Sequence, residues 1–176
     1  MYRILTVACA VLLLAGAASA VVVTLPNTTQ TTTFTATVSE QANVSVPASV
    51  AFNVTNVSAD TNSADQSVSA TTVVLSDGKA LRVEIQAGAA DFTAPSGGTV
   101  TWAAGDISWD AATWTNGTGS ANALSSASYT TVATSSANAA SLSASDLTFT
   151  LADKNTVDRA GDHTLAATWK FSSVTP

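Results

Sequence analysis

The residue with the clearest catalytic potential in this chain is its single histidine, which lies among acids. His163 follows the turn-prone residues 158–161 and stands next to Asp162, with Asp158 close by in the sequence. A Ser-His-Asp hydrolase needs an imidazole that contacts a nucleophilic hydroxyl and is oriented by a carboxylate. Serine is abundant, but the sequence contains no G-x-S-x-G nucleophile elbow. We therefore expect His163 to pack at a strand edge, and we expect the protein not to be an enzyme.

Paired carboxylates would be the next route to catalysis. Glu40, Glu84, Asp106 and Asp110 are the acids that lie outside obvious turns. A glycosidase needs two carboxyl groups held across a cleft, one of them desolvated. Glu84 alternates with Arg82 among apolar neighbours, which indicates the polar face of a strand. We interpret these acids as separate surface groups.

One loop of the sequence is a candidate for metal binding. Residues 153–158 begin like a D-x-N calcium loop, but Val157 occupies the next ligand position and the expected glycine is missing, so the EF-hand pattern fails. Loop calcium stays an alternative to ordinary turn chemistry, in which Asp and Asn accept hydrogen bonds from the backbone. We expect no other cofactor, since one histidine cannot form a multi-histidine site.

Three tryptophans fall close together in a chain with few aromatic residues. Trp102, Trp109 and Trp114 would form a stacking platform for sugar rings if they were exposed on one face. Buried, they would fill a core whose other residues are mostly small. We expect burial of at least two of them, and a carbohydrate-binding module that uses these three residues is the alternative function.

The first twenty residues have the features of a secretory signal peptide. Arg3 supplies a positive start, residues 4–14 are apolar, and residues 18–20 form a small-residue cleavage site. We predict a signal peptide over residues 1–20, a single domain over residues 21–176, and a secreted or cell-surface protein. The leader is too short and its residues are too small to span a bilayer, so we expect no transmembrane segment in the mature chain.

Charge and cysteine content exclude several further functions. The net charge is −6 with twelve acidic side chains, so no basic patch is available to neutralise the phosphates of nucleic acid. The only cysteine, Cys9, lies in the leader. Without it, the mature chain has no thiol for catalysis, zinc binding or disulfides, and it has to be stabilised by its hydrophobic core.

The pattern of the mature chain is that of an all-β protein. Residues 31–38 are rich in threonine, and residues 50–57 alternate apolar with polar or small side chains, as half-buried strands do. Residues 67–75 and 81–87 predict a hairpin around Asp77 and Gly78. About eight to ten short strands separated by turns predict an antiparallel β-sandwich, Ig-like or jelly-roll-like.

The segment between these strands and the C-terminal region is less regular. Residues 107–114 fit a strand with a bulge or a loop that folds back on the sheet, and residues 116–120 fit a turn. Residues 135–142 admit a helical turn. Residues 147–151 alternate again as a strand does.

The last strand pattern is the clearest one in the chain. His163, Leu165, Ala167, Trp169 and Phe171 share one side of a period of two, and we expect this strand to pair in the interior of a sheet.

This stretch resembles the end of the WxL cell-surface domain family, in which a G-x-Y segment precedes a Thr-Trp-x-Leu strand and a nearby proline. Here the matching residues are Gly161-Asp162-His163 and Thr168-Trp169-Lys170-Phe171, with Pro176 behind them. The 76–83 turn region and residues 90–92 resemble the region of the family's first motif, with Leu81 in place of its tryptophan. The resemblance implies a β-sandwich attached non-covalently to cell-wall polymer, with Trp169 and Phe171 in the attachment motif.

These observations favour a structural or adhesive role at a cell surface. The expected partners are cell-wall polymer or surface polysaccharide, or further copies of the chain that self-associate through edge strands. In a filament subunit, residues 21–38 would add as a strand to the open edge of a neighbour.

Overall fold

The computed structural model describes residue 29 and residues 31–176, so the predicted signal peptide and Cys9 lie outside the described residues. The chain divides into two units, Met1–Thr37 and Val38–Pro176. In the first unit, residues 29 and 31–37 form neither helix nor strand, and their side chains are exposed. The strand predicted at residues 31–38 is therefore not formed. Its alternating pattern suits a sheet, but a strand needs a neighbour to satisfy its backbone groups.

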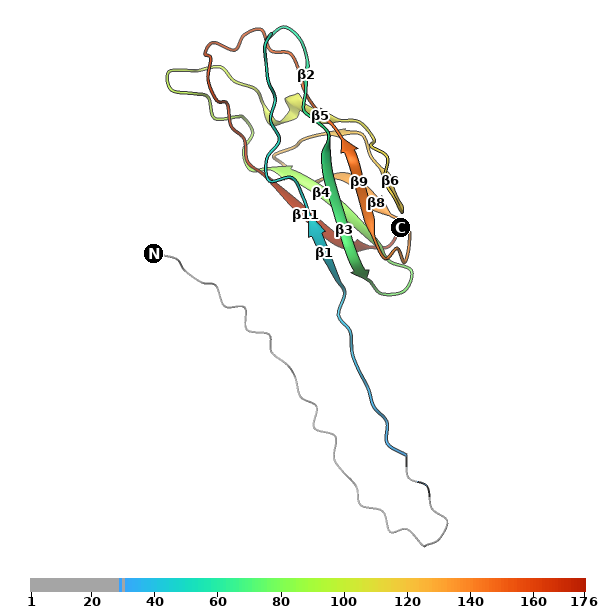
Figure 1. Ribbon diagram of the computed structural model, residues 1–176. Helices are drawn as coiled ribbons and strands as arrows, with labels where there is room; N and C mark the ends of the chain where they lie inside the picture. Colours follow the sequence, from blue (N-terminus) through green and yellow to red (C-terminus); the bar gives the residue numbers. More distant parts are fainter. Residues whose placement is uncertain (1–28, 30) are drawn as a thin grey trace, which may run out of the picture. The chain divides into compact units, whose positions relative to one another are not determined.

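The regular secondary structure of the second unit is almost entirely β-strand, and all strand pairs are antiparallel (Figure 1). Its only described helical element is a single 3₁₀ turn, η1 (Ala104–Asp106). The strands are β1 (Gln41–Ser45), β2 (Thr61–Asn62), β3 (Gln66–Val74), β4 (Ala80–Ala87), β5 (Ile107–Trp109), β6 (Gly117–Gly119), β7 (Asn122–Ala123), β8 (Thr130–Ser135), β9 (Leu142–Leu147), β10 (Phe149–Leu151) and β11 (Ala167–Val174). The predicted all-β, antiparallel sandwich-like class is confirmed, with eleven strands in the described residues.

The strands form three sheets. Their orders are β1-β3-β9, β2-β10-β5-β7 and β11-β4-β8-β6. Only Thr148 separates β9 from β10, so the first two sheets are joined through nearly continuous chain. No helix in the described residues is long and apolar enough to cross a membrane.

Strand β11 lies at the edge of its sheet, and the prediction that it pairs in the interior is wrong. It pairs with β4 alone, in register from Ala167 opposite Ala87 to Val174 opposite Ala80. The predicted alternation is confirmed at His163, Leu165, Trp169 and Phe171, which are half-buried, whereas Ala167 is exposed. The other edge of β11 therefore carries backbone groups that no strand of the described chain pairs.

Strands β3 and β4 do not form the predicted hairpin. The turn forms as expected, with Gly78 at a φ of 73° and the Lys79 amide bonded to the Ser76 carbonyl at 3.1 Å. Beyond it the two strands enter different sheets. Each strand buries an alternating apolar set, such as Val68 in β3 and Val83 in β4, and both sets belong to one core. Joining the two sheets at this turn places both apolar faces in the sandwich interior.

Two further predictions in the middle of the chain are wrong. Residues 116–120 were expected to form a turn, but β6 pairs there with β8. A Cβ at Gly117 would lie 2.5 Å from Leu142 Cδ1, so glycine lets the backbone approach the core closely. The helical turn expected at residues 135–142 is instead a tight connection between β8 and β9.

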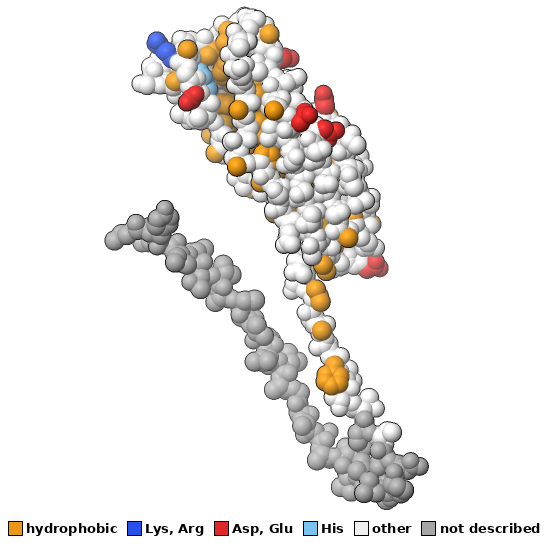
Figure 2. Space-filling view, viewed as in Figure 1, with side chains coloured by type: hydrophobic (Ala, Val, Ile, Leu, Met, Phe, Trp, Pro, Cys, Tyr) orange, Lys and Arg blue, Asp and Glu red, His pale blue; other side chains and the backbone are white. Residues whose placement is uncertain are grey.

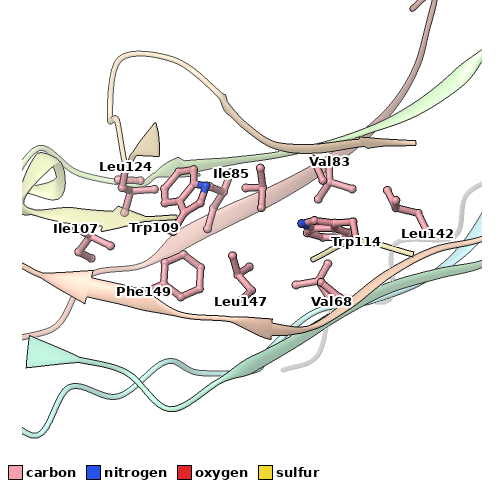
Figure 3. Close-up of a cluster of buried hydrophobic side chains, with 14 of the residues drawn as sticks. Val68, Val83, Ile85, Ile107, Trp109, Trp114, Leu124, Leu142, Leu147 and Phe149 are labelled. Atoms are coloured by element: carbon pink, nitrogen blue, oxygen red, sulfur yellow. The ribbon is translucent and has the colours of Figure 1, made fainter. Parts of the chain in front are cut away.

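The core lies between the sheets and combines small aliphatic residues with large aromatic ones (Figure 3). The Trp109 and Phe149 rings meet edge to face with centroids 5.8 Å apart. Figure 3 shows Leu147 beside Phe149 in the same cluster, and Leu147 has no exposed surface. This packing holds the domain together without a disulfide in the described residues.

Truncating Leu147 tests this core. We expect Leu147→Ala to lower the free energy of unfolding by about 2–5 kcal/mol, because it leaves a cavity in tight packing. Val44→Ala, at a position that is 49% exposed on β1, is the matched control and should cost less than about 1 kcal/mol. Urea denaturation of both variants measures the difference, and equal effects would contradict the assigned core.

Candidate functional site

The three clustered tryptophans are buried, so Trp102, Trp109 and Trp114 do not form the exposed sugar-stacking platform that was the alternative to burial. Their exposed fractions are 4%, 2% and 7%. The Trp102 and Trp109 indoles donate hydrogen bonds to the carbonyls of Ala152 and Ser120. The expectation that at least two of these rings are buried is confirmed. Bulky rings fill the space between sheets whose other core residues are small, so the three rings do not form one exposed face.

His163 is held by a hydroxyl and a carbonyl. Its Nδ1 lies 2.7 Å from Thr101 Oγ1 and its Nε2 lies 3.0 Å from the Arg159 carbonyl oxygen. Because a carbonyl only accepts, Nε2 carries the proton and Nδ1 accepts from the threonine. The ring also meets Trp102 edge to face at 5.1 Å. His163 thus ties the chain after Asp158 to the segment around Thr101.

The acids near His163 do not orient its ring. The Asp158 carboxylate accepts hydrogen bonds from the Thr99 hydroxyl at 2.7 Å and from the Thr99 and Val100 amides at 3.1 Å. These bonds, chiefly that from the Thr99 hydroxyl, lower the pKa of Asp158 to about 2. The imidazole instead contacts a hydroxyl at Nδ1 and a backbone carbonyl at Nε2, so no carboxylate orients it as in a triad.

The four carboxylates singled out from the sequence have separate surroundings. Glu40 accepts a 2.8 Å hydrogen bond from the Ser76 amide, and the Ser76 side chain and backbone lower the pKa of the Glu40 carboxyl. Glu84 lies 3.1 Å from Lys170, its register partner on β11. Glu84 is nevertheless buried, at 9% exposed, so it is not the surface group expected from the sequence, and the cross-strand partner compensates its charge.

The other two acids are held in different places. Asp106 lies 3.0 Å from Lys154 and accepts a hydrogen bond from the Ala103 amide within η1. Asp110 lines a small hollow of about 290 Å³ together with Asp146. The described contacts therefore engage Glu40, Glu84 and Asp106 one by one and give no glycosidase-like pairing among them.

The loop considered for calcium is bonded to the rest of the domain through the Asp153 amide and the Asp158 carboxylate. The Asp153 amide is bonded to Asp60 Oδ1, and the Asp158 carboxylate is occupied by Thr99 and Val100. Among the residues described, no group of three His, Cys, Asp or Glu side chains is placed to hold a metal ion. The geometry corresponds to the turn chemistry that was the alternative to calcium.

A second hollow, much larger than the first, is a mainly apolar groove of about 1030 Å³. One wall is formed by residues 47–54 with Val57, and the opposite wall by residues 157–167 with Trp169. Its floor consists of seven core side chains, of which all but the half-buried Phe92 are at most 8% exposed: Ile85, Phe92, Trp102, Ile107, Leu124, Phe149 and Leu151. Hydrophobic side chains gather on the upper half of the domain in the view of Figure 2. The groove thus gives access from the surface to the core between the sheets.

The first wall of the groove has the side-chain pattern of a strand without a partner. Val50, Phe52 and Val54 are half-buried against the core, and the residues between them are exposed. Residues 46–55 nevertheless make no backbone hydrogen bond to any other described residue. Backbone groups in a folded protein normally find partners, and at a surface they find water. The predicted alternation over residues 50–57 holds as far as Val54, but the predicted strand is not formed.

The second wall leads into the edge strand β11. Thr164 pairs with Thr93 through two backbone bonds of 2.8 and 3.1 Å, so one side of this segment is already satisfied. Trp169 is half-buried and lines the groove, while Phe171 is half-buried against the core. Of the residues assigned to a wall-attachment motif, Trp169 is the one that lines the groove.

Charges lie only at one wall of the groove. Asp158, Arg159 and Asp162 are its charged lining residues, and the remainder are apolar or neutral. Asp158 is bound to the 99–100 backbone, and Arg159 donates to the Gly97 carbonyl at 3.2 Å. The surface left for a ligand is apolar with free peptide groups, which suits an extended apolar chain better than an ion or a sugar.

The chain matches no protein-family model, no curated protein and no solved structure.

Protonation of Asp158 should weaken its hydrogen bonds to Thr99 and Val100, which hold the groove wall of residues 157–167. In the folded state its pKa is about 2, below the ordinary value of 3.8, so between these pH values the unfolded chain binds more protons. Stability gained through Asp158 is therefore present above pH 4 and is lost as the pH falls toward 2. We expect Asp158→Asn to flatten the pH dependence of the unfolding midpoint in this range.

Urea unfolding at several pH values measures this slope. The exchange Asn155→Ser, at an exposed position without a titratable group, is the control and should keep the slope of the wild type. An Asp158→Asn variant with the same slope as the wild type would show that the Thr99 and Val100 contacts do not hold this carboxylate in solution.

Proposed function

We propose that this protein is an exported, non-catalytic structural component of a cell surface that assembles by accepting an extended chain into its groove. The observation that carries the proposal is the groove itself, where an apolar floor lies next to ten residues whose backbone is unpaired within the described chain. Strand addition uses this combination, because the main chain supplies hydrogen bonds and the floor accommodates alternate side chains.

Export and a surface location are supported by the sequence alone. The leader has the charge and length of a signal peptide, and threonine, serine and valine dominate the strands. The role of His163 also supports a structural function, because both of its ring nitrogens are used to join two chain segments. Attachment to wall polymer near Trp169, which the WxL resemblance implies, belongs to the same proposal, and Trp169 lines the groove.

Substitution in the groove tests the proposal in cells that express the chain. We expect the wild type in the envelope or polymer fraction and Phe52→Asp largely in the soluble culture fraction, because a carboxylate would be buried against an apolar strand. The adjacent Asn53→Asp adds the same charge on the exposed side and should behave like the wild type.

Circular dichroism shows whether the Phe52→Asp variant keeps its fold. Since Phe52 also packs against the core, Val50→Ser serves as a second, milder groove variant and should shift the distribution in the same direction. Wild-type protein found wholly in the soluble fraction would overturn the proposed function.

A further inference from the structure

The structure points to one occupant for the groove, and this inference rests on the proposed assembly function. We infer that residues 31–38 of a second copy bind in the groove as an added β-strand. Residues 46–55 and the free edge of β11 would supply the flanking backbone groups. Each chain would then carry one donor segment and one acceptor groove.

The donor segment has the pattern that a half-buried strand requires. Thr31, Thr33, Thr35 and Thr37 fall on one side of the period of two, and Phe34, Ala36 and Val38 fall on the other. β-Branched and aromatic residues favour strands, and the threonine side suits contact with solvent. The segment contains no charged residue. Its apolar side therefore matches a floor that offers no partner for a charge.

The large apolar side chains of this segment are exposed. Phe34 is 93% exposed and Val38 is 68% exposed. These are the two most exposed large hydrophobic side chains among the residues described. Entry into the groove would remove the Phe34 ring from water and place it against other apolar side chains, which is the main source of affinity for such a segment.

The dimensions and the free hydrogen-bonding groups agree with this placement. Eight residues in a strand span about 27 Å at about 3.4 Å per residue. The unpaired wall, residues 46–55, is ten residues long and can therefore align with the whole donor segment. An added strand would give the amides and carbonyls of this wall the partners that they lack in the described chain.

The position of β1 favours a donor from another copy. The donor segment ends at Val38, and Glu40 is fixed to the Ser76 amide just before β1 begins at Gln41. The groove wall begins only at Pro47, beyond β1, so a chain would have to reverse its direction to enter its own groove. A donor from a second copy needs no such reversal. Pairing of donor and groove in different copies is heterologous and therefore produces rings or filaments.

A pair of substitutions in the full mature chain tests the donor segment. Phe34→Asp should reduce the polymer fraction in sedimentation about tenfold or more, because it removes the aromatic anchor and adds a charge facing the floor. Thr35→Asp adds the same charge on the solvent side and should change the polymer fraction by less than about threefold. Both positions are exposed and outside the strands, so neither variant should alter folding of the domain.

Mixed disulfide trapping tests the contact itself, since the mature chain has no cysteine. Equimolar Thr35→Cys and Ala51→Cys chains, oxidised together, should give a heterodimer. The matched mixture of Thr35→Cys with Ala137→Cys, an exposed position in the turn between β8 and β9, should not. The pairs Thr33→Cys with Ala51→Cys, and Thr35→Cys with Asn53→Cys, extend the scan to the neighbouring registers.

The outcomes separate this inference from the proposed function. Trapping within a single chain that carries both cysteines, without trapping between chains, would show that the segment fills its own groove and would overturn the inference. Polymers that survive Phe34→Asp, with no cross-link at any of the scanned pairs, would also overturn it. In that case the protein could still be a surface component that assembles through another edge. Wild-type protein that does not associate with the envelope at all would instead contradict the proposed function.

Discussion

The structure of this domain depends on which partners the backbone N–H and C=O groups find at the edges of its antiparallel sheets. Without disulfides in the described residues, the fold is held by alternating apolar side chains buried between sheets and by the ladders that bring those side chains together. The ladders are complete around β4, which is paired on both sides. They are incomplete between residues 46–55 and β11, where the core is reached through the groove. The candidate site is the place where the domain lacks a strand.

The same constraint accounts for the polar interactions around the groove. The wall that contains residues 157–167 has no ladder with the opposite wall. Its far part is held by the backbone bonds between Thr93 and Thr164. Its near part is held by side chains, because Asp158 binds the 99–100 backbone and His163 bridges Thr101 and the Arg159 carbonyl. Residues that have catalytic potential in the sequence are used here to fix a loop segment. The hydrogen bonds of this carboxylate and this imidazole hold the groove wall in position.

Sequence patterns predicted the class of fold well and its connections less well. Period-two alternation is local, so it identified the buried faces of β3, β4 and β11. Whether consecutive strands pair is decided by long-range packing, and for this reason the turn at Gly78 joins two sheets although its residues suit a hairpin. Burial of Trp102, Trp109 and Trp114 likewise depends on neighbours distant in sequence. Sequence could not show that residues 46–55 lack partners, because an unpaired strand has the same alternation as a paired one. The alternation of Val50, Phe52 and Val54 was the signal that pointed to this wall.

The most direct test of the account is amide hydrogen exchange of residues 46–55 in the full mature chain, compared between dilute monomer and assembled protein. If an added strand pairs with this wall, the amides that face it should become protected by about a hundredfold or more on assembly, while those of β4 should change little. Exchange at residues 46–55 that stays as fast in the assembly as in the monomer would contradict the claim that the groove receives a strand.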